Sequence, residues 1–301
     1  MINNMKKLLF LFSVIALAAC GDSDDGVNTP PDVPSPRLLT VEVGENPMQD
    51  ESANAREMTR AGDATTTASL SNFYMNYQNN KYTFTKGGTG WNTIPWPTGD
   101  EKDTKIDFYA YNYDRVDGTA FQWNGGNPYV AFTMDENAFV QKDFLVATHK
   151  QISYNDANGH VSLTFDHACA AVQFNICQTQ TVTNQGHKFA VNSVVLKNVC
   201  KNGDYYYDSG WKLDSKYSIY TDYTLTNKKA ISLTTDYQTL PCQWLFLIPQ
   251  PQTGVKLEIK YTVDDSAEKT KTIDVGTGSW VKGTKYIINI KVGTSFIIPQ
   301  S

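Results

Sequence analysis

The sequence predicts an all-β protein built of antiparallel β-sandwich domains. Thr, Asn, Tyr and Val are abundant and long runs of Ala, Leu and Glu are missing, which favours strands over helices. Short strand-like stretches recur about every ten positions with turn residues between them, and this recurrence is typical of a sandwich. A chain of 301 residues is long enough for two such domains in tandem.

The first segment, residues 1–19, is predicted to be a lipoprotein signal peptide. Lys6 and Lys7 precede an apolar run at residues 8–17 (LLFLFSVIAL), which is too short to span a bilayer. Small residues then stand directly before Cys20 (LAAC), as in a lipobox, so we expect a lipid anchor on Cys20. The alternative is an ordinary secretory peptide that is cleaved elsewhere.

Residues 20–36 are predicted to be a tether. The stretch is acidic and then rich in proline (GDSDDGVNTPPDVPSP after Cys20), so it cannot bury a core and is expected to be extended.

Residues 37–180 are predicted to form an N-terminal sandwich domain. Its first strand comprises Leu38, Leu39, Thr40, Val41, Glu42 and Val43. A polar loop with Arg56 and Arg60 follows. Further strands are expected at residues 70–77, 81–85, 106–113, 129–133 and 144–147, with a strand pair or one bulged strand at residues 161–176 around Asp166 and His167.

Residues 181–301 are predicted to form a C-terminal sandwich domain, with the boundary in the polar stretch 178–188. Strands are expected at residues 189–198, 240–248, 255–263, 270–275 and 286–292. Residues 255–263 alternate between apolar and polar side chains, which indicates a half-buried antiparallel strand. Asp264 and Asp265 are expected to form the hairpin turn that follows it.

Several function classes are disfavoured. The net charge of −5 without a basic stripe argues against nucleic acid as a partner. There is no nucleophile motif such as G-x-S-x-G and no Gly-rich phosphate loop, so we expect neither an enzyme nor a cofactor. Asp166 beside His167 suggests an acid/base pair, but neighbours along a strand point to opposite faces, which favours a structural histidine.

Four cysteines remain after Cys20, and they show no metal-binding spacing. We expect buried free thiols, which pack as small hydrophobic groups. The alternative is a disulfide, for which Cys200 and Cys242 are the preferred pair in an exported protein. The four are Cys169, Cys177, Cys200 and Cys242.

Aromatic residues gather in the predicted loops. Exposed rings could stack on sugars, but folding of the rings back onto the ends of the sandwich is the favoured interpretation. The residues are Trp91, Trp96, Trp123, Tyr205, Tyr206, Tyr207 and Trp211.

The order of several motifs resembles the fimbrillin (Mfa-like) family of anchored pilus subunits. The resemblance spans nearly the whole mature chain. The matching pieces are residues 38–43 (LLTVEV), 59–61 (TRA), 106–111 (IDFYAY), 142–147 (KDFLVA), 161–174 (VSLTFDHACAAVQF), 247–250 with 259–261, and 280–290 (WVKGTKYIINI).

This resemblance implies two transthyretin-like β-sandwich domains and assembly by strand exchange. An Arg-specific protease would cut between Arg60 and Ala61, releasing the first strand and opening a groove for a strand of the next subunit. Alternatively, Arg60 simply caps a turn. The candidate donor strand of this chain is the short apolar group Phe296, Ile297 and Ile298.

The resemblance also bears on location and partners. Surface lipoproteins of Bacteroidales-type bacteria carry acidic residues like Asp22, Asp24 and Asp25 as an export signal, although a solvated linker explains them as well. We therefore expect an outer-membrane lipoprotein at the cell surface, a structural or adhesive fimbrial subunit whose partners are other subunits, the membrane and the protease. The alternative is a surface lipoprotein that does not polymerise and binds glycans or host ligands.

Overall fold

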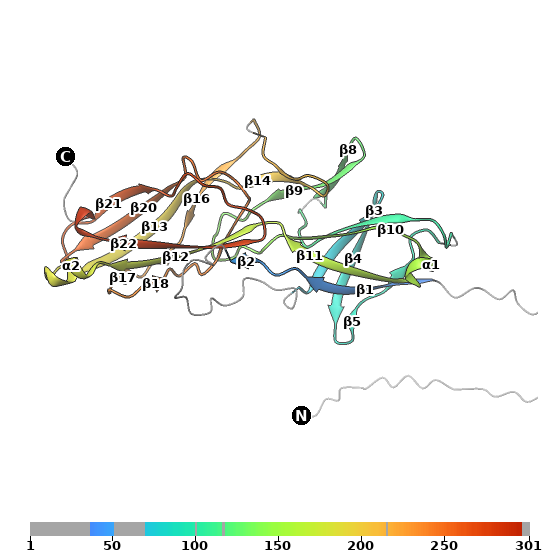
Figure 1. Ribbon diagram of the computed structural model, residues 1–301, viewed down its shortest axis with the longest axis horizontal. Coiled ribbons are helices and arrows are strands. Elements are labelled where there is room, and N and C mark those ends of the chain that lie inside the picture. Colours follow the sequence, from blue (N-terminus) through green and yellow to red (C-terminus); the bar gives the residue numbers. More distant parts are fainter. Residues whose placement is uncertain (1–36, 51–69, 100, 116–117, 215, 297–301) are drawn as a thin grey trace, which may run out of the picture. The chain divides into compact units, whose positions relative to one another are not determined.

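The computed structural model describes residues 37–50, 70–99, 101–115, 118–214 and 216–296. These residues form an almost entirely β protein, as predicted, with only the short helices α1 (Tyr154–Ala157) and α2 (Gln180–Asn184) and a 3-10 turn at Thr294–Phe296 among them (Figure 1). Within the described ranges, no helix is long and apolar enough to cross a membrane.

The first sheet contains the N-terminal strand. All its neighbouring strands pair antiparallel except β1 and β11, which are parallel. In spatial order its strands are β5 (Gly90–Trp91), β4 (Asn80–Gly87), β3 (Asn72–Tyr77), β7 (Ile106–Tyr111), β10 (Leu145–Ile152), β11 (His160–His167), β1 (Leu38–Glu45) and β6 (Ile94–Pro95).

One face of this sheet buries an aromatic core. Phe73 and Phe84 stack with their ring centroids 4.9 Å apart, and Phe165 meets Phe73 edge-on. Leu39 of β1 belongs to the same cluster and is fully buried. The first strand therefore completes a core whose other members come from residues 70–165.

Three further sheets hold the remaining strands. One runs β18 (Gln238–Thr239), β12 (Ala170–Gln178), β22 (Thr284–Val292) and β2 (Gln49–Asp50), with β19 (Leu245–Leu247) also on β12. The next runs β16 (Tyr220–Thr224), β13 (Phe189–Cys200), β20 (Lys256–Val263) and β21 (Lys269–Asp274), with β17 (Ile231–Ser232) on β13. The last runs β15 (Gly210–Lys212), β14 (Asn202–Tyr206), β9 (Asn127–Thr133) and β8 (Phe121–Asn124).

The second core lies between these sheets. Phe174 and Ile290 from the β12–β22 sheet share a buried cluster with Val194 and Ile259 from the β13–β20 sheet. Period-two burial along β20 matches the predicted alternation. Two sheets that contribute alternate side chains to one core are packed face to face, as in a sandwich.

Most predicted strands are found within a few residues of their expected bounds, and Asp264 and Asp265 form the predicted turn with positive φ. The expected strand at residues 240–248 is shortened to β19. The two strands expected at residues 161–176 are found as β11 and β12, but the prediction that they pair or form one bulged strand is wrong, because they lie in different sheets. Ala168 and Cys169 carry the chain from one sheet to the other.

The predicted domain boundary remains a prediction. β12 lies in the predicted N-terminal domain, yet it pairs in parallel with β22 over residues 171–178 and 285–292. The N-terminal segment reaches the same sheet, since β2 pairs with β22 and the buried Met48 joins the second core. The segment 38–50 thus contacts strands on both sides of the boundary.

All four cysteines of the body are free and buried, as predicted, and Cys200 and Cys242 form no disulfide. Burial raises the pKa of the Cys242 thiol to about 11. These thiols act as small apolar core groups.

Gly159 holds the start of β1 in place. Its carbonyl accepts hydrogen bonds from the Thr40 amide at 2.8 Å and the Thr40 hydroxyl at 3.2 Å. Its φ of +75° favours glycine, and a Cβ here would lie 2.5 Å from the Leu38 carbonyl oxygen. The turn before β11 therefore fits against the β1 backbone only with glycine at this position.

We expect Gly159→Ala to loosen β1. The left-handed backbone costs about 1–3 kcal/mol for a non-glycine residue, and the clash with Leu38 adds to it. Gly186→Ala is the matched control, because Gly186 has φ +80° and open space around its Cβ position. Chemical denaturation measures both losses, and an equal loss in the two variants would contradict the role assigned to Gly159.

Candidate functional site

The strand β1 is attached to the body mainly along one edge. It pairs with β11 from Thr40↔His160 to Glu45↔Phe165. On its other edge β6 pairs with Leu38 and Leu39 alone. Among the described residues, β11 therefore supplies most of the ladder that holds β1, and departure of β1 would expose the β11 edge.

The two faces of β1 differ in polarity. Leu39 is fully buried and Val41 and Val43 pack against the same core, whereas Glu42 is 72% exposed in its side chain. On the outward face Glu42 accepts a hydrogen bond from the Ser162 hydroxyl at 3.3 Å. The inward face is thus an apolar row that packs on the first core.

That apolar row ends in a buried polar cluster. Glu45, the last residue of β1, lies with Oε1 2.8 Å from Nε2 of His167. The other ring nitrogen, Nδ1, is hydrogen-bonded to Oδ2 of Asp143. The side chains of His167 and Asp143 are 2% and 0% exposed, and that of Glu45 is 15% exposed. One histidine therefore joins β1, β11 and the segment before β10.

The cluster favours a protonated ring. Burial lowers the pKa of His167, but the hydrogen bond and charge of Asp143, followed by those of Glu45, outweigh burial and raise the pKa above its ordinary value. The imidazolium then donates from both nitrogens. It also compensates the negative charge of Asp143, which would otherwise be costly at complete burial.

The expected structural role of His167 agrees with this geometry. Asp166 and His167 do point to opposite faces, because Asp166 accepts a hydrogen bond from Asn46 Nδ2 at 2.5 Å while His167 turns inward. The sequence offered no sign of Asp143 as the partner. Both nitrogens of His167 are engaged, so the ring has no free atom for acid/base work.

Several predicted site residues lie outside the described residues. Phe296 is described; it is 7% exposed and its carbonyl accepts a hydrogen bond from the Tyr261 hydroxyl at 2.5 Å. Service as a donor strand, which stays a prediction, would require Phe296 to leave this position. The residues outside are Cys20, Asp22, Asp24, Asp25, Arg56, Arg60, Ala61, Ile297 and Ile298.

The prediction that these aromatics lie in loops is wrong for most of them, because Trp91, Trp123, Tyr205, Tyr206 and Trp211 belong to strands. The expectation that the rings mostly fold inward is confirmed. Trp96, Tyr205 and Tyr206 are buried. The Trp211 indole donates to the Ala168 carbonyl at 2.6 Å. Trp123, at 39% exposure, is the most open of the group. An array of exposed rings for stacking on sugars is therefore not formed by these residues.

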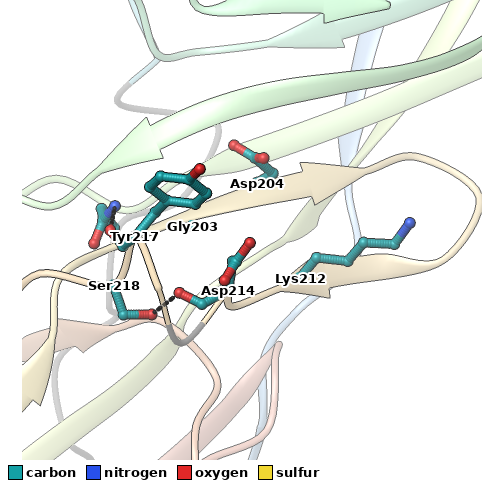
Figure 2. Close-up of a pocket in the computed structure, with 7 residues that line it drawn as sticks. Gly203, Asp204, Lys212, Asp214, Tyr217 and Ser218 are labelled. Atoms are coloured by element: carbon teal, nitrogen blue, oxygen red, sulfur yellow. Dashed lines mark hydrogen bonds between the residues drawn. The ribbon is translucent and has the colours of Figure 1, made fainter. Parts of the chain in front are cut away.

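A surface cavity lies beside the hairpin of β14 and β15 (Figure 2). Its volume is about 300 Å³. Figure 2 shows the Ser218 hydroxyl directed at the Asp214 carbonyl, which accepts its hydrogen bond at 2.8 Å. The lining residues are Asn202, Gly203, Asp204, Lys212, Asp214, Tyr217 and Ser218.

The cavity combines carboxylates with an exposed ring. Burial, followed by the negative charge of Asp214, raises the pKa of Asp204. The positive charge of Lys212 acts in the opposite direction and lowers this pKa, but by less. The Lys212 amine lies 3.9 Å from the centroid of the Tyr206 ring. Tyr217 is 64% exposed. Sequence reasoning missed this site, because none of its lining residues forms a recognisable motif.

Comparisons with known proteins concern the fold and the family. A family model described as fimbrillin-like matches residues 55–301. No curated protein matches the chain. A fimbrial protein from Bacteroides vulgatus is 19% identical, with a TM-score of 0.53 and coverage of 85% of this chain and 95% of that one. A candidate cell adhesion protein from Bacteroides eggerthii is 13% identical, with a TM-score of 0.51 and coverage of 86% of each chain.

We expect Glu45→Leu to destabilise the fold by about 1.5–3 kcal/mol, the worth of a hydrogen bond to a charged group. The matched variant Glu42→Leu, on the outward face, should cost no more than about 0.5 kcal/mol. Urea denaturation at pH 6 measures both values, and equal losses would contradict the role assigned to the cluster.

The Glu45 contribution should also depend on pH. The folded-state pKa of His167 is raised above its ordinary value of 6.5, so the stabilisation is fully present below that value. It is lost as pH rises through the folded-state pKa. The difference in unfolding free energy between the wild type and Glu45→Leu should therefore shrink from pH 6 to pH 9, and a constant difference would speak against a protonated ring.

Proposed function

Because this chain belongs to the fimbrillin-like family, we propose that it is a structural or adhesive subunit of cell-surface fimbriae. The family supports association with other fimbrial subunits at the cell surface. The fold that the chain shares with a fimbrial protein from Bacteroides vulgatus is consistent with this role. In this role the chain needs no catalytic group.

We further propose that the subunit assembles by strand exchange. The observation that carries this step is the seating of β1, which seals the first core with Leu39 while most of its outer edge lacks a strand partner among the described residues. A chain cut after Arg60 would release β1 together with β2. The exposed β11 edge and apolar groove would then be suited to a strand from a second subunit, which restores both the ladder and the burial.

The cut is proposed at Arg60 and not at Arg37. Arg37 donates from Nη1 to the Gly99 carbonyl at 2.8 Å, and its own carbonyl accepts from the Trp96 amide. Cleavage there would also leave β1 on the body. Arg60 lies beyond β2 in a polar stretch of sequence, the kind of segment that proteases cleave.

Export as an outer-membrane lipoprotein completes the proposal. The lipobox before Cys20 and the acidic residues after it support this route. A lipid on Cys20 would hold the precursor at the membrane until cleavage releases the body from its tether.

Digestion of the full-length precursor with an Arg-specific protease should yield SDS-resistant ladders and filaments whose subunits begin at Ala61. Arg56→Lys and Arg60→Lys together should abolish most of this assembly, because the first strand then stays attached. Arg37→Lys is the matched control and should assemble normally. Mass spectrometry and electron microscopy provide the measurements, and assembled subunits that retain residues 38–50 would contradict strand release.

The alternative of a surface protein that binds glycans is favoured by one observation, the cavity beside β14 and β15. The exposed Tyr217 ring offers a face for a sugar, and Asp204 and Asp214 offer acceptors for its hydroxyl groups.

On a glycan array, this alternative predicts a saccharide-specific signal that Tyr217→Ala removes. Tyr237→Ala is the control, since Tyr237 is also exposed, at 42%, but does not line the cavity. A subunit without this function should show no saccharide preference with either variant.

A further inference from the structure

The inward face of β1 ends at Glu45, whose carboxylate accepts a hydrogen bond from the buried ring of His167. Leu39, Val41 and Val43 contact the apolar core, and the next residue on that face, Glu45, meets Nε2 of His167 at 2.8 Å. The His167 side chain is only 2% exposed, so Nε2 depends on Glu45 and not on bulk solvent. The face of the strand is therefore specified as three apolar side chains followed by an acid.

Loss of β1 would remove this acceptor and leave the donor. This step rests on the proposed strand exchange. His167 belongs to β11 and Asp143 to the segment before β10, so both stay with the body. An incoming strand that covered Nε2 with an apolar side chain would bury a hydrogen-bond donor without a partner. Burying the donor in this way costs more free energy than leaving it in contact with water.

We propose that the groove left by β1 selects an extended segment of another fimbrial subunit that carries a carboxylate at the position facing His167, six residues after its first buried apolar side chain. Apolar side chains at alternate positions before it fill the places of Leu39, Val41 and Val43. The carboxylate completes the arrangement of one imidazolium between two acidic groups. The groove thus selects its partner by the shape of the apolar side chains and also by the carboxylate at one position.

The charged groups around the His167 ring determine the pH range in which the groove selects a carboxylate. Glu45 from β1 and Asp143 from the segment before β10 are the charged groups that face it. Asp166 points to the opposite face, where Asn46 donates to it. Cys169 nearby stays a neutral thiol, because burial raises its pKa well above the ordinary value. Selection for an acid should therefore hold while His167 is protonated and weaken as pH rises.

Fluorescent peptides with the sequence of residues 38–46 (LLTVEVGEN) provide the test. The full chain carries Arg37→Lys, Arg56→Lys and Arg115→Lys. Arg60 is then its only arginine, so an Arg-specific protease opens the chain there. At pH 6 the cleaved chain should bind the Glu45→Leu peptide about tenfold or more weakly than the unchanged peptide. The matched Glu42→Leu peptide changes the outward face and should bind within about twofold of the unchanged peptide.

Two further measurements separate hydrogen bonding from packing. In a chain with His167→Leu and Asp143→Leu together, the preference for the unchanged peptide should disappear or reverse, because the pair is replaced by apolar groups. In the chain with native His167, the preference should fall between pH 6 and pH 9, a readout that does not depend on the double variant folding. A preference that persists unchanged at pH 9 would overturn the proposal.

The remaining outcomes distinguish the selection from strand exchange itself. If the cleaved chain binds the unchanged and Glu45→Leu peptides equally, the groove accepts strands without selecting an acid. If it binds neither peptide after complete cleavage, strand exchange is itself refuted, and the selection with it.

Discussion

The contact between β1 and β11 is the constraint on which the rest of the first sheet depends. It joins residues 120 positions apart, such as Thr40 and His160, and it closes the core over Leu39. Burial of one leucine is worth about 1.5–3 kcal/mol. Since β6 pairs with two residues of β1 only, the strand closes the core and is held mainly along its β11 edge. That combination is what a replaceable strand needs.

The polar cluster at the end of β1 gives this contact its register. A slip of β1 by one residue would turn Leu39, Val41 and Val43 outward. A slip by two residues would keep them inward but would place Val43 near His167, leaving a buried donor without an acceptor. The apolar row alone tolerates such a two-residue slip, because its side chains are similar in size and shape. Glu45 is therefore the residue that separates the correct register from its nearest competitor.

Structural features that depend on residues close together in the sequence can be predicted from it, whereas features that depend on distant residues cannot. Strands with clear alternation, such as β20, and turns with a local cause, such as Asp264 and Asp265, could be predicted. Strand partners could not, because alternation shows which face is buried and not which strand lies alongside. The sequence therefore predicts β12 as the pair of β11 or as its continuation, although β12 pairs with β22. The tyrosine-rich strand β14 was missed, since glycine and aspartate interrupt its pattern.

The polar cluster around His167 also depends on residues that are far apart in the sequence, so the sequence alone does not predict it. The opposite directions of neighbouring side chains along a strand predict a structural role for His167, and this is a local argument. Its partners lie 24 and 122 residues away, at Asp143 and Glu45, and only the folded chain brings the three together. A buried charged group remains in a core only if its partners are supplied. Two of the three groups belong to the body and the third to β1, so any strand that occupies this groove, whether tethered or borrowed, must meet the same polar requirement.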